Sequence, residues 1–290
     1  MNALKVLIYQ IALNYYWHFP FKKGKAFLLK TIYKLIGNAN FKVGEEVFSL
    51  SPVSYIDNVL LKTGKFDERI IQVIKLALAN GGMYLDIGAN FGYYAVLAAK
   101  MPGVSVLAVE PSPREFTRLQ ENTQLNNLKN IRSLEVAVGD FSGKRMLHLS
   151  DLWNTSMNSF NPAFKGGNAS GNHQSVEVKC HRVDDIVTTD EYKDLKLIKI
   201  DVEGSEYEVL QGMSNLLRHF NGILICEITP GVSEDDPNHI NEIYSILKAQ
   251  GFKGFYGLDF SRQYDEFFYK PGNFEQQFKH LTLSWKGKAQ

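Results

Sequence analysis

The chain has 290 residues, with 32 basic and 31 acidic side chains, and this length allows one large domain or a domain with an N-terminal extension. This balance argues against nucleic acid as the main partner, because proteins that neutralise phosphates usually carry a basic excess. The two cysteines, Cys180 and Cys226, are too few for a disulfide framework or a zinc site, and a reducing, cytoplasmic setting fits them best.

Residues 1–45 are expected to form an N-terminal helical extension made of two short helices. The segment mixes aromatic side chains with lysines, among them Tyr15, Trp17, Lys22 and Lys23. Such a mixture either packs on the main domain as an extra helical layer or lies at a membrane interface. We expect the packed layer and keep peripheral membrane contact as the alternative.

Residues 46–290 alternate strand and helix patterns, which predicts a mostly parallel sheet covered on both faces. A small strand pair is expected within residues 46–59. Further strands are expected at residues 83–87, 104–110, 131–138, 147–149, 176–183, 195–202 and 222–229. Helices are expected at residues 66–78, 93–100, 113–126, 205–218 and 238–250. The last two strands, at residues 252–258 and 266–270, can only form an antiparallel hairpin.

A polar insertion at about residues 150–175 breaks this alternation and is rich in Asn, Gly and Ser. A loop of this length inside a compact domain is usually functional or disordered. It is therefore a candidate lid over an acceptor, with a flexible surface loop as the alternative. Its first part combines an aromatic ring with polar groups that suit a sugar: Trp153, Asn154, Ser156, Met157 and Asn158.

The first motif with chemical content is a strand that ends at Asp86 and continues into a glycine turn formed by Gly88, Asn90 and Gly92. A strand, a glycine turn and a helix start together predict backbone N–H groups pointing at a ligand. The dinucleotide fingerprint would need glycine at positions 90 and 93, where this chain has Asn90 and Tyr93. A carboxylate at the turn suits a cation better than a pyrophosphate. The turn therefore predicts S-adenosylmethionine, a cationic nucleoside.

Two further acids are candidates for the same pocket. Glu110 follows the next strand and could accept both ribose hydroxyls, as an acid at a similar distance does in dinucleotide-binding folds. Asp140 follows the third strand and could accept from the adenine amino group. For Asp140 an ordinary turn residue is an equally good reading.

The second motif lies at the end of the strand expected at residues 195–202. Lys199 stands inside an apolar strand, so it should meet a carboxylate, either Asp201 or Glu227. Asp201 or Glu203 is the expected general base toward an acceptor hydroxyl, with Lys199 and Glu227 holding the polar network around it. The same three acids could bind Mg²⁺, but their spacing is not diagnostic and no metal is indicated.

Other residues offer simpler or competing roles. Glu206 is explained as a charge in the first turn of a helix. His173 and His181, near the insertion, are alternative bases.

Taken together, these motifs resemble FkbM-type S-adenosylmethionine-dependent methyltransferases over about residues 47–229. The resemblance is carried by LDIGANFGYYAVLAA, VLAVEPSPREFTRLQENTQLNN, AVGDFSG, NTSMNSF and LIKIDVEGSEYEVLQG. It implies a Rossmann-like class I fold, with a seven-stranded, mostly parallel sheet ending in an antiparallel hairpin. It also implies O-methyl transfer to a hydroxyl of a sugar, glycan or related small molecule.

Two rival functions remain open at this point. One is a nicotinamide-dependent oxidoreductase on a Rossmann fold, which the residues at positions 86, 90 and 93 disfavour. The other is a non-catalytic module that binds a nucleoside. The sequence names neither the acceptor nor the oligomeric state.

Overall fold

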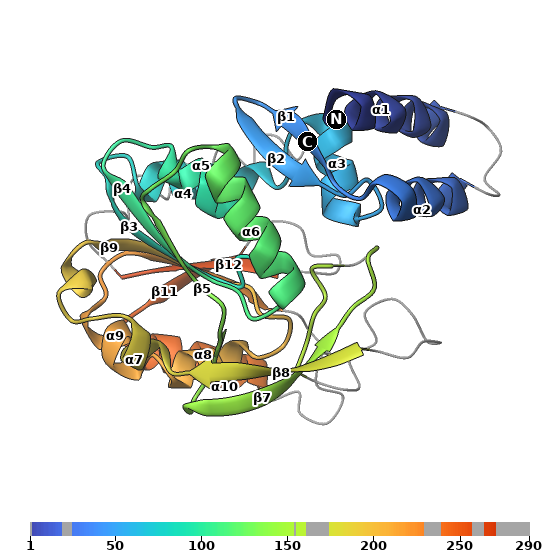
Figure 1. Ribbon diagram of the computed structural model, residues 1–290. Helices are drawn as coiled ribbons and strands as arrows, with labels where there is room; N and C mark the ends of the chain where they lie inside the picture. The colour runs from blue at the N-terminus through green and yellow to red at the C-terminus, as the bar shows by residue number, and fades with distance from the viewer. Residues whose placement is uncertain are drawn as a thin grey trace.

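The computed structural model describes residues 2–18, 25–153, 155–160, 174–228, 239–256 and 264–270. Its centre is a seven-stranded sheet in the order β11-β12-β10-β9-β3-β4-β5 (Figure 1). The strands of this sheet are β3 (Gly82–Ile87), β4 (Val104–Val109), β5 (Ile131–Leu134), β9 (Leu195–Ile200), β10 (Ile223–Ile228), β11 (Lys253–Tyr256) and β12 (Tyr264–Tyr269).

Five neighbouring strands of this sheet, from β5 to β10, run parallel. Strand β12 is antiparallel to both β10 and β11. This arrangement confirms the expected mostly parallel sheet with a C-terminal antiparallel hairpin. Parallel strands bring their carboxyl ends to one edge, so β3, β4, β9 and β10 deliver the residues that follow them to one place.

Helices cover both faces of the sheet (Figure 1). One face carries α4 (Glu68–Ala77), α5 (Tyr93–Ala99) and α6 (Pro113–Leu125). The other carries α7 (Val183–Ile186), α8 (Glu206–Gln211), α9 (Ser214–His219) and α10 (His239–Ala249). A short 3-10 helix, η1 (Glu191–Lys193), precedes β9. The two apolar layers explain why the parallel strands are near-continuous hydrophobic runs.

Two smaller sheets flank this core. Strands β6 (Ala137–Val138), β7 (Gly143–Leu149) and β8 (Gln174–His181) form one of them, in the order β6-β8-β7. Strands β1 (Ala39–Val43) and β2 (Glu46–Leu50) form an antiparallel hairpin. The hairpin is preceded by α1 (Asn2–His18) and α2 (Lys25–Ile36) and followed by α3 (Tyr55–Thr63). None of the described helices is long and apolar enough to cross a membrane.

Three local predictions were wrong. The partner of β2 is β1 rather than a segment within residues 46–59, part of which forms α3. The strand expected at 131–138 is divided, because β5 belongs to the large sheet and β6 pairs with β8. The helix expected at 205–218 is two helices. They separate at Gly212, where an added Cβ would lie 1.8 Å from the carbonyl oxygen of Gly139.

The β1–β2 hairpin is attached to the core by Asn122 of α6 and by Asn126, the C-cap residue of this helix. Asn122 accepts a hydrogen bond from the N–H of Ser49, and Asn126 accepts one from Val47 and donates one to its carbonyl. These two positions lie one helical turn apart and therefore share a face. Their amides satisfy the backbone of β2, which would otherwise be left unpaired.

A buried ion pair attaches α3 to the same helix. Arg118 of α6 donates a 2.5 Å hydrogen bond to Asp57 of α3, and both side chains are almost completely buried. Asp57 also accepts from the N–H of Ser51, and the guanidinium lies over the Phe91 ring at 4.6 Å. Removing one partner would leave the other charge buried without compensation.

Substituting Asp57→Ala should therefore lower the free energy of unfolding by about 3–5 kcal/mol, measured by urea denaturation. Asp190→Ala is the matched control, because that side chain is 94% exposed. The control should change stability by less than about 0.5 kcal/mol. A loss below about 1 kcal/mol for Asp57→Ala would contradict a structural role of the ion pair.

Candidate active site

The carboxyl ends of β3, β4, β9 and β10 surround a cavity of about 650 Å³. This volume lies within the range of pockets that hold small molecules and cofactors. Charged and polar residues reach it from each of these strand ends: Asn90, Glu110, Lys199, Asp201, Glu203 and Glu227. Five of these six were singled out from the sequence as strand-end residues, and the sixth belongs to the glycine turn.

The glycine turn has a different role from the one expected. The N–H groups of Gly88 and Ala89 donate to the carbonyl of Val109, and that of Gly92 donates to Ala89. The N–H of Asn90 donates to Glu110, and the N–H of Phe91 donates to the Asn90 side chain. Every N–H from 88 to 92 is thus bonded within the protein. The expectation that they point at a ligand was wrong.

Glycine is needed at the turn for a close approach between the two motifs. Gly88 has φ +78°, and a Cβ there would lie 1.8 Å from the carbonyl oxygen of Asp201. Asp201 in turn donates its N–H to the carbonyl of Ile87. The turn therefore packs directly on the loop that follows β9, so the two motifs form one structural unit.

Glu110 is buried at the floor of the cavity. Its two carboxylate oxygens accept one backbone N–H each, from Asn90 at 2.8 Å and from Ser112 at 2.9 Å. Burial, together with the nearby Glu115 carboxylate, raises the pKa of Glu110 to about 8. In the ionised form each oxygen keeps a second lone pair, so the carboxylate can still accept two hydroxyl donors side by side.

Strand geometry explains how several charged side chains come together. The residues of β3, β9 and β10 that pack under α4, α5 and α6 are Tyr84, Leu197, Ile223 and Ile225. Successive side chains alternate between the faces of a sheet. Asp86, Lys199 and Glu227 therefore lie on this same face, and Asp86 is the direct register partner of Lys199.

Lys199 is the centre of this group. Its ammonium donates to Asp201 at 2.7 Å and lies 5.4 Å from the centre of the Tyr94 ring. This contact confirms the expected carboxylate partner. Burial lowers the pKa of Lys199, but the carboxylates of Asp201, Asp86 and Glu227 outweigh it and hold the pKa above its ordinary value.

Asp86 is completely buried and belongs to the charge balance of Lys199. Burial raises the pKa of Asp86 to about 6, although the nearby Lys199 ammonium and Tyr84 hydroxyl oppose the shift. Asp86 does not line the cavity, whereas Lys199 does. Its action on a ligand would therefore pass through Lys199.

Glu203 is held in an unusual backbone conformation at the cavity wall. Its φ is +54°, a left-handed value that is uncommon outside glycine. Its side chain is 7% exposed, and Oε2 has no hydrogen-bond partner among the described residues. Burial and the neighbouring Asp201 and Glu206 carboxylates raise the pKa of Glu203 well above its ordinary value. A strained, buried and unpaired acid facing a cavity is a strong candidate for chemistry.

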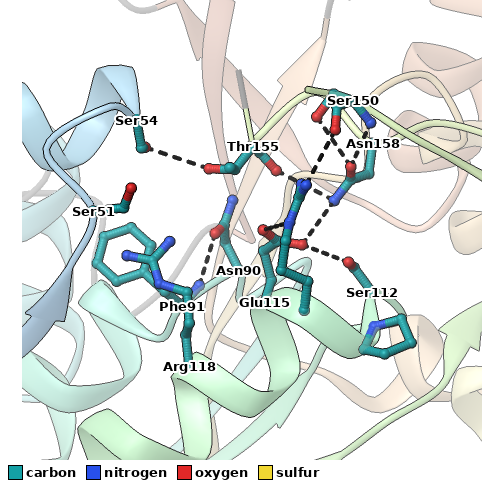
Figure 2. Close-up of polar contacts among 12 residues, drawn as sticks. Ser51, Ser54, Asn90, Phe91, Ser112, Glu115, Arg118, Ser150, Thr155 and Asn158 are labelled. Carbon is teal, nitrogen blue, oxygen red and sulfur yellow. Dashed lines mark hydrogen bonds and ion pairs between the residues drawn. The ribbon is translucent and has the colours of Figure 1, made fainter. Parts of the chain in front are cut away.

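The start of the insertion is fixed to the rim of the cavity by a polar network (Figure 2). Asn158 donates to the Thr155 carbonyl and to Glu115, and it accepts from both the N–H and the hydroxyl of Ser150. Glu115 also accepts from Ser112 and Arg114. The amide of Asn158 is therefore fully used within the protein, and it positions the loop instead of supplying the sugar contact expected from the sequence.

Neighbouring residues of the insertion reach the cavity. Ser156, Met157 and Asn158 line it, and Trp153 does not. Ser159 donates to the carbonyl of Glu203 at 2.9 Å, which ties this loop to the strained residue. Most of the expected lid, residue 154 and residues 161–173, lies outside the described residues, as does His173.

The remaining candidates lie elsewhere. Asp140 is exposed and does not line the cavity, and neither does His181. Glu206 is buried and accepts from the N–H of Gly204, and burial raises its pKa to about 7. Within the described part of the chain, no group of three or more His, Cys, Asp or Glu side chains is arranged to hold a metal ion.

Sequence reasoning did not single out Tyr94, Glu115 or Ser159 as part of the site. Tyr94 follows the glycine turn and could have been read as an aromatic facing the same strand end. The contacts of Glu115 and Ser159 join segments that are more than 40 residues apart. No local sequence pattern predicts such contacts.

Comparison with known proteins points in one direction. Residues 86–253 match the sequence model of the methyltransferase FkbM domain. The hexuronic acid methyltransferase AglP of Haloferax volcanii is 27% identical over 182 residues, covering 63% of this chain and 69% of that protein. The 31-O-demethyl-FK506 methyltransferase FkbM of Streptomyces tacrolimicus is 27% identical over 200 residues, covering 60% of this chain and 74% of that protein.

Among solved structures, a methyltransferase FkbM from Methylobacillus flagellatus aligns with a TM-score of 0.44 at 17% identity. The alignment covers 66% of this chain and 44% of that one.

The raised pKa of Glu110 predicts a pH dependence of folding stability. The unfolded state loses the Glu110 proton near its ordinary value of 4.5, whereas the folded state keeps it up to about 8. Between these pH values the folded state binds more protons, so stability falls as pH rises. Chemical denaturation should show a decrease of at least about 1 kcal/mol from about pH 5 to about pH 8.

The raised pKa values of Asp86 and Glu206 also make folding stability fall as pH rises. Glu110→Gln should flatten the slope, because glutamine does not ionise. Glu177→Gln, at a half-exposed position outside the cavity, is the control and should keep the wild-type slope. An unchanged slope in Glu110→Gln would contradict the assigned shift.

Proposed function

The chain belongs to the FkbM methyltransferase family, and we propose that it transfers the methyl group of S-adenosylmethionine to a hydroxyl oxygen of a sugar or a related small molecule. Family membership makes it an S-adenosylmethionine-dependent methyltransferase. The single observation that carries the finer proposal is Glu203, a buried acid with an unpartnered oxygen, in the same cavity as Glu110.

The residues of the cavity fit the nucleoside part of this cofactor. Glu110 would accept the two ribose hydroxyls on its remaining lone pairs. The adenine ring would lie against an apolar part of the wall, formed by Val136, Val138, Leu147 and Phe160. The cationic end would lie near the carboxylates beside Lys199. Because Asp140 is outside the cavity, its expected contact with adenine has no support from the geometry.

The same geometry disfavours the rival oxidoreductase. A nicotinamide dinucleotide needs free backbone N–H groups at the glycine turn for its pyrophosphate. Here all five N–H groups of the turn are already bonded within the protein.

When bound, the cofactor supplies an electrophilic methyl group and a neutral thioether leaving group. The residues of the chain must align the acceptor oxygen, exclude water and receive its proton. Glu203 is better placed than Asp201 to receive the proton, because Asp201 is bonded to Lys199 and one oxygen of Glu203 has no partner. The proton moves from the acceptor hydroxyl to Glu203 as the oxygen–carbon bond forms.

A sugar or a similar polyol is the acceptor class that the cavity suits. Its lining includes aromatic and charged side chains from α3, α4 and the segment between them, among them Tyr55, Phe66, Asp67 and Arg69. Aromatic faces with hydrogen-bonding neighbours are typical of small-molecule pockets that orient polar ligands. The relative from Haloferax volcanii is named for a hexuronic acid, which supports a sugar acid as the first acceptor to test.

Substituting Glu203→Gln should reduce kcat by about a hundredfold or more, because a positioned general base contributes that much to proton transfer. The measurement is transfer of labelled methyl from S-adenosylmethionine to a panel of hexuronic acids and glycans. Affinity for S-adenosylhomocysteine, measured by calorimetry, should change less than about threefold. Glu177→Gln should keep the wild-type rate, because Glu177 lies outside the cavity.

Three results would contradict the proposal. A near-wild-type rate in Glu203→Gln would exclude Glu203 as the general base. Binding of NAD with no binding of S-adenosylhomocysteine would instead favour the oxidoreductase. A wild-type protein that binds S-adenosylhomocysteine but transfers no methyl group to any acceptor in the panel would favour the non-catalytic module.

A further inference from the structure

Helices α1 and α2 expose apolar side chains that the protein itself leaves uncovered. Among the described residues, eleven large hydrophobic side chains are exposed, and seven of them lie in these two helices. The most exposed are Leu4 (64%), Leu7 (53%), Ile11 (65%), Phe27 (76%) and Leu35 (79%). Single exposed hydrophobic residues are ordinary, but seven on two helices that pack together favour an interaction surface.

The exposure does not arise from a loosely attached helix. Tyr9 is completely buried on the inner face of α1, and its hydroxyl donates to the carbonyl of Gly37 at 2.7 Å. Trp17 donates to the side chain of Asn58 in α3 at 2.9 Å. Leu4, Leu7 and Ile11 are spaced three and four residues apart, so they share the outer face of this fixed helix.

The same region carries positive charge without any acidic side chain. Residues 1–44 contain seven lysines and no aspartate, glutamate or arginine. The other 246 residues contain the remaining 25 basic and all 31 acidic side chains. On α2 the exposed Lys30 and Lys34 lie among the exposed Phe27 and Leu35. An apolar face with interspersed lysines is typical of helices that lie in the interface of an anionic bilayer.

We propose that α1 and α2 form a membrane-docking surface, defined here by Leu4, Leu7, Ile11, Phe27, Lys30, Lys34 and Leu35, which binds bilayers containing anionic lipids. The two helices pack on each other at one end of the molecule (Figure 1). At 17 and 12 residues they are suited to lying on a bilayer and not to spanning it.

Two other occupants fit the surface less well. A second copy of the chain would bring two lysine-rich faces together, and like charges would repel. Nucleic acid would satisfy the lysines but would leave the leucines and Phe27 exposed to its charged backbone. A bilayer supplies both anionic headgroups and an apolar interior.

The test is flotation of the full-length protein with vesicles of phosphatidylcholine alone or with about 30% phosphatidylserine. We expect binding to the anionic vesicles that weakens as salt rises from about 0.05 to about 0.5 M, because salt screens surface charge. Leu7→Ser with Ile11→Ser should reduce the bound fraction about tenfold or more, since both side chains would lose their burial in lipid. Lys30→Glu with Lys34→Glu should abolish the preference for anionic vesicles.

The matched control is Phe141→Ser with Met146→Ser, two residues that are also about half exposed but lie outside α1 and α2. The control should bind vesicles as the wild type does. The Leu7 and Ile11 variant should keep the wild-type melting temperature and affinity for S-adenosylhomocysteine, because both side chains are exposed and far along the chain from the cavity residues. These readouts are independent of methyl transfer.

Three outcomes would overturn the proposal. The first is the absence of vesicle binding by the wild type. The second is equal binding by the Leu7 and Ile11 variant. The third is a wild-type dimer in light scattering that the same variant converts to a monomer, which would assign the surface to a second copy.

Discussion

The rest of the site depends on one buried ammonium group, that of Lys199. An isolated charge in an apolar sheet would be too costly to keep, so its position requires acids nearby. The alternation of side chains along parallel strands supplies two of them, since Asp86 and Glu227 fall on the same face of the sheet as Lys199. Asp201, just beyond the end of β9, supplies the third through a direct hydrogen bond.

This charge balance also orders the loop in which the reaction would occur. Directly after β9, Asp201 is held by Lys199 and its carbonyl oxygen packs against Gly88. Two residues further on, Glu203 adopts a left-handed conformation, with its carbonyl bonded to Ser159 and its side chain at the cavity wall. The glycine turn and the second motif thus depend on each other structurally. The two motifs together therefore identify the site better than either motif alone.

The strands and the acids at their ends could be predicted from the sequence, because a buried parallel strand is an apolar run and an acid at its end interrupts that run. The resemblance to a known family added the Rossmann-like class I fold and the number of strands in its sheet. The sequence did not reveal that the N–H groups of the glycine turn are used internally, because that depends on the approach of Val109 and Glu110 from β4. Nor did it reveal that the side-chain amide of Asn158 makes all its hydrogen bonds within the protein, to Glu115, Thr155 and Ser150. Both facts are set by contacts between distant segments, for which local pattern carries no signal.

The pH dependence of kcat tests the central claim most directly. If Glu203 is the base and Lys199 the neighbouring cation, kcat should rise with pH along a limb that reports the ionisation of Glu203. The Lys199 ammonium lowers the pKa of Glu203, against the larger effect of burial. Lys199→Met should therefore move this limb to higher pH. A limb at the same pH in both proteins, or a rate that does not depend on pH, would contradict the account.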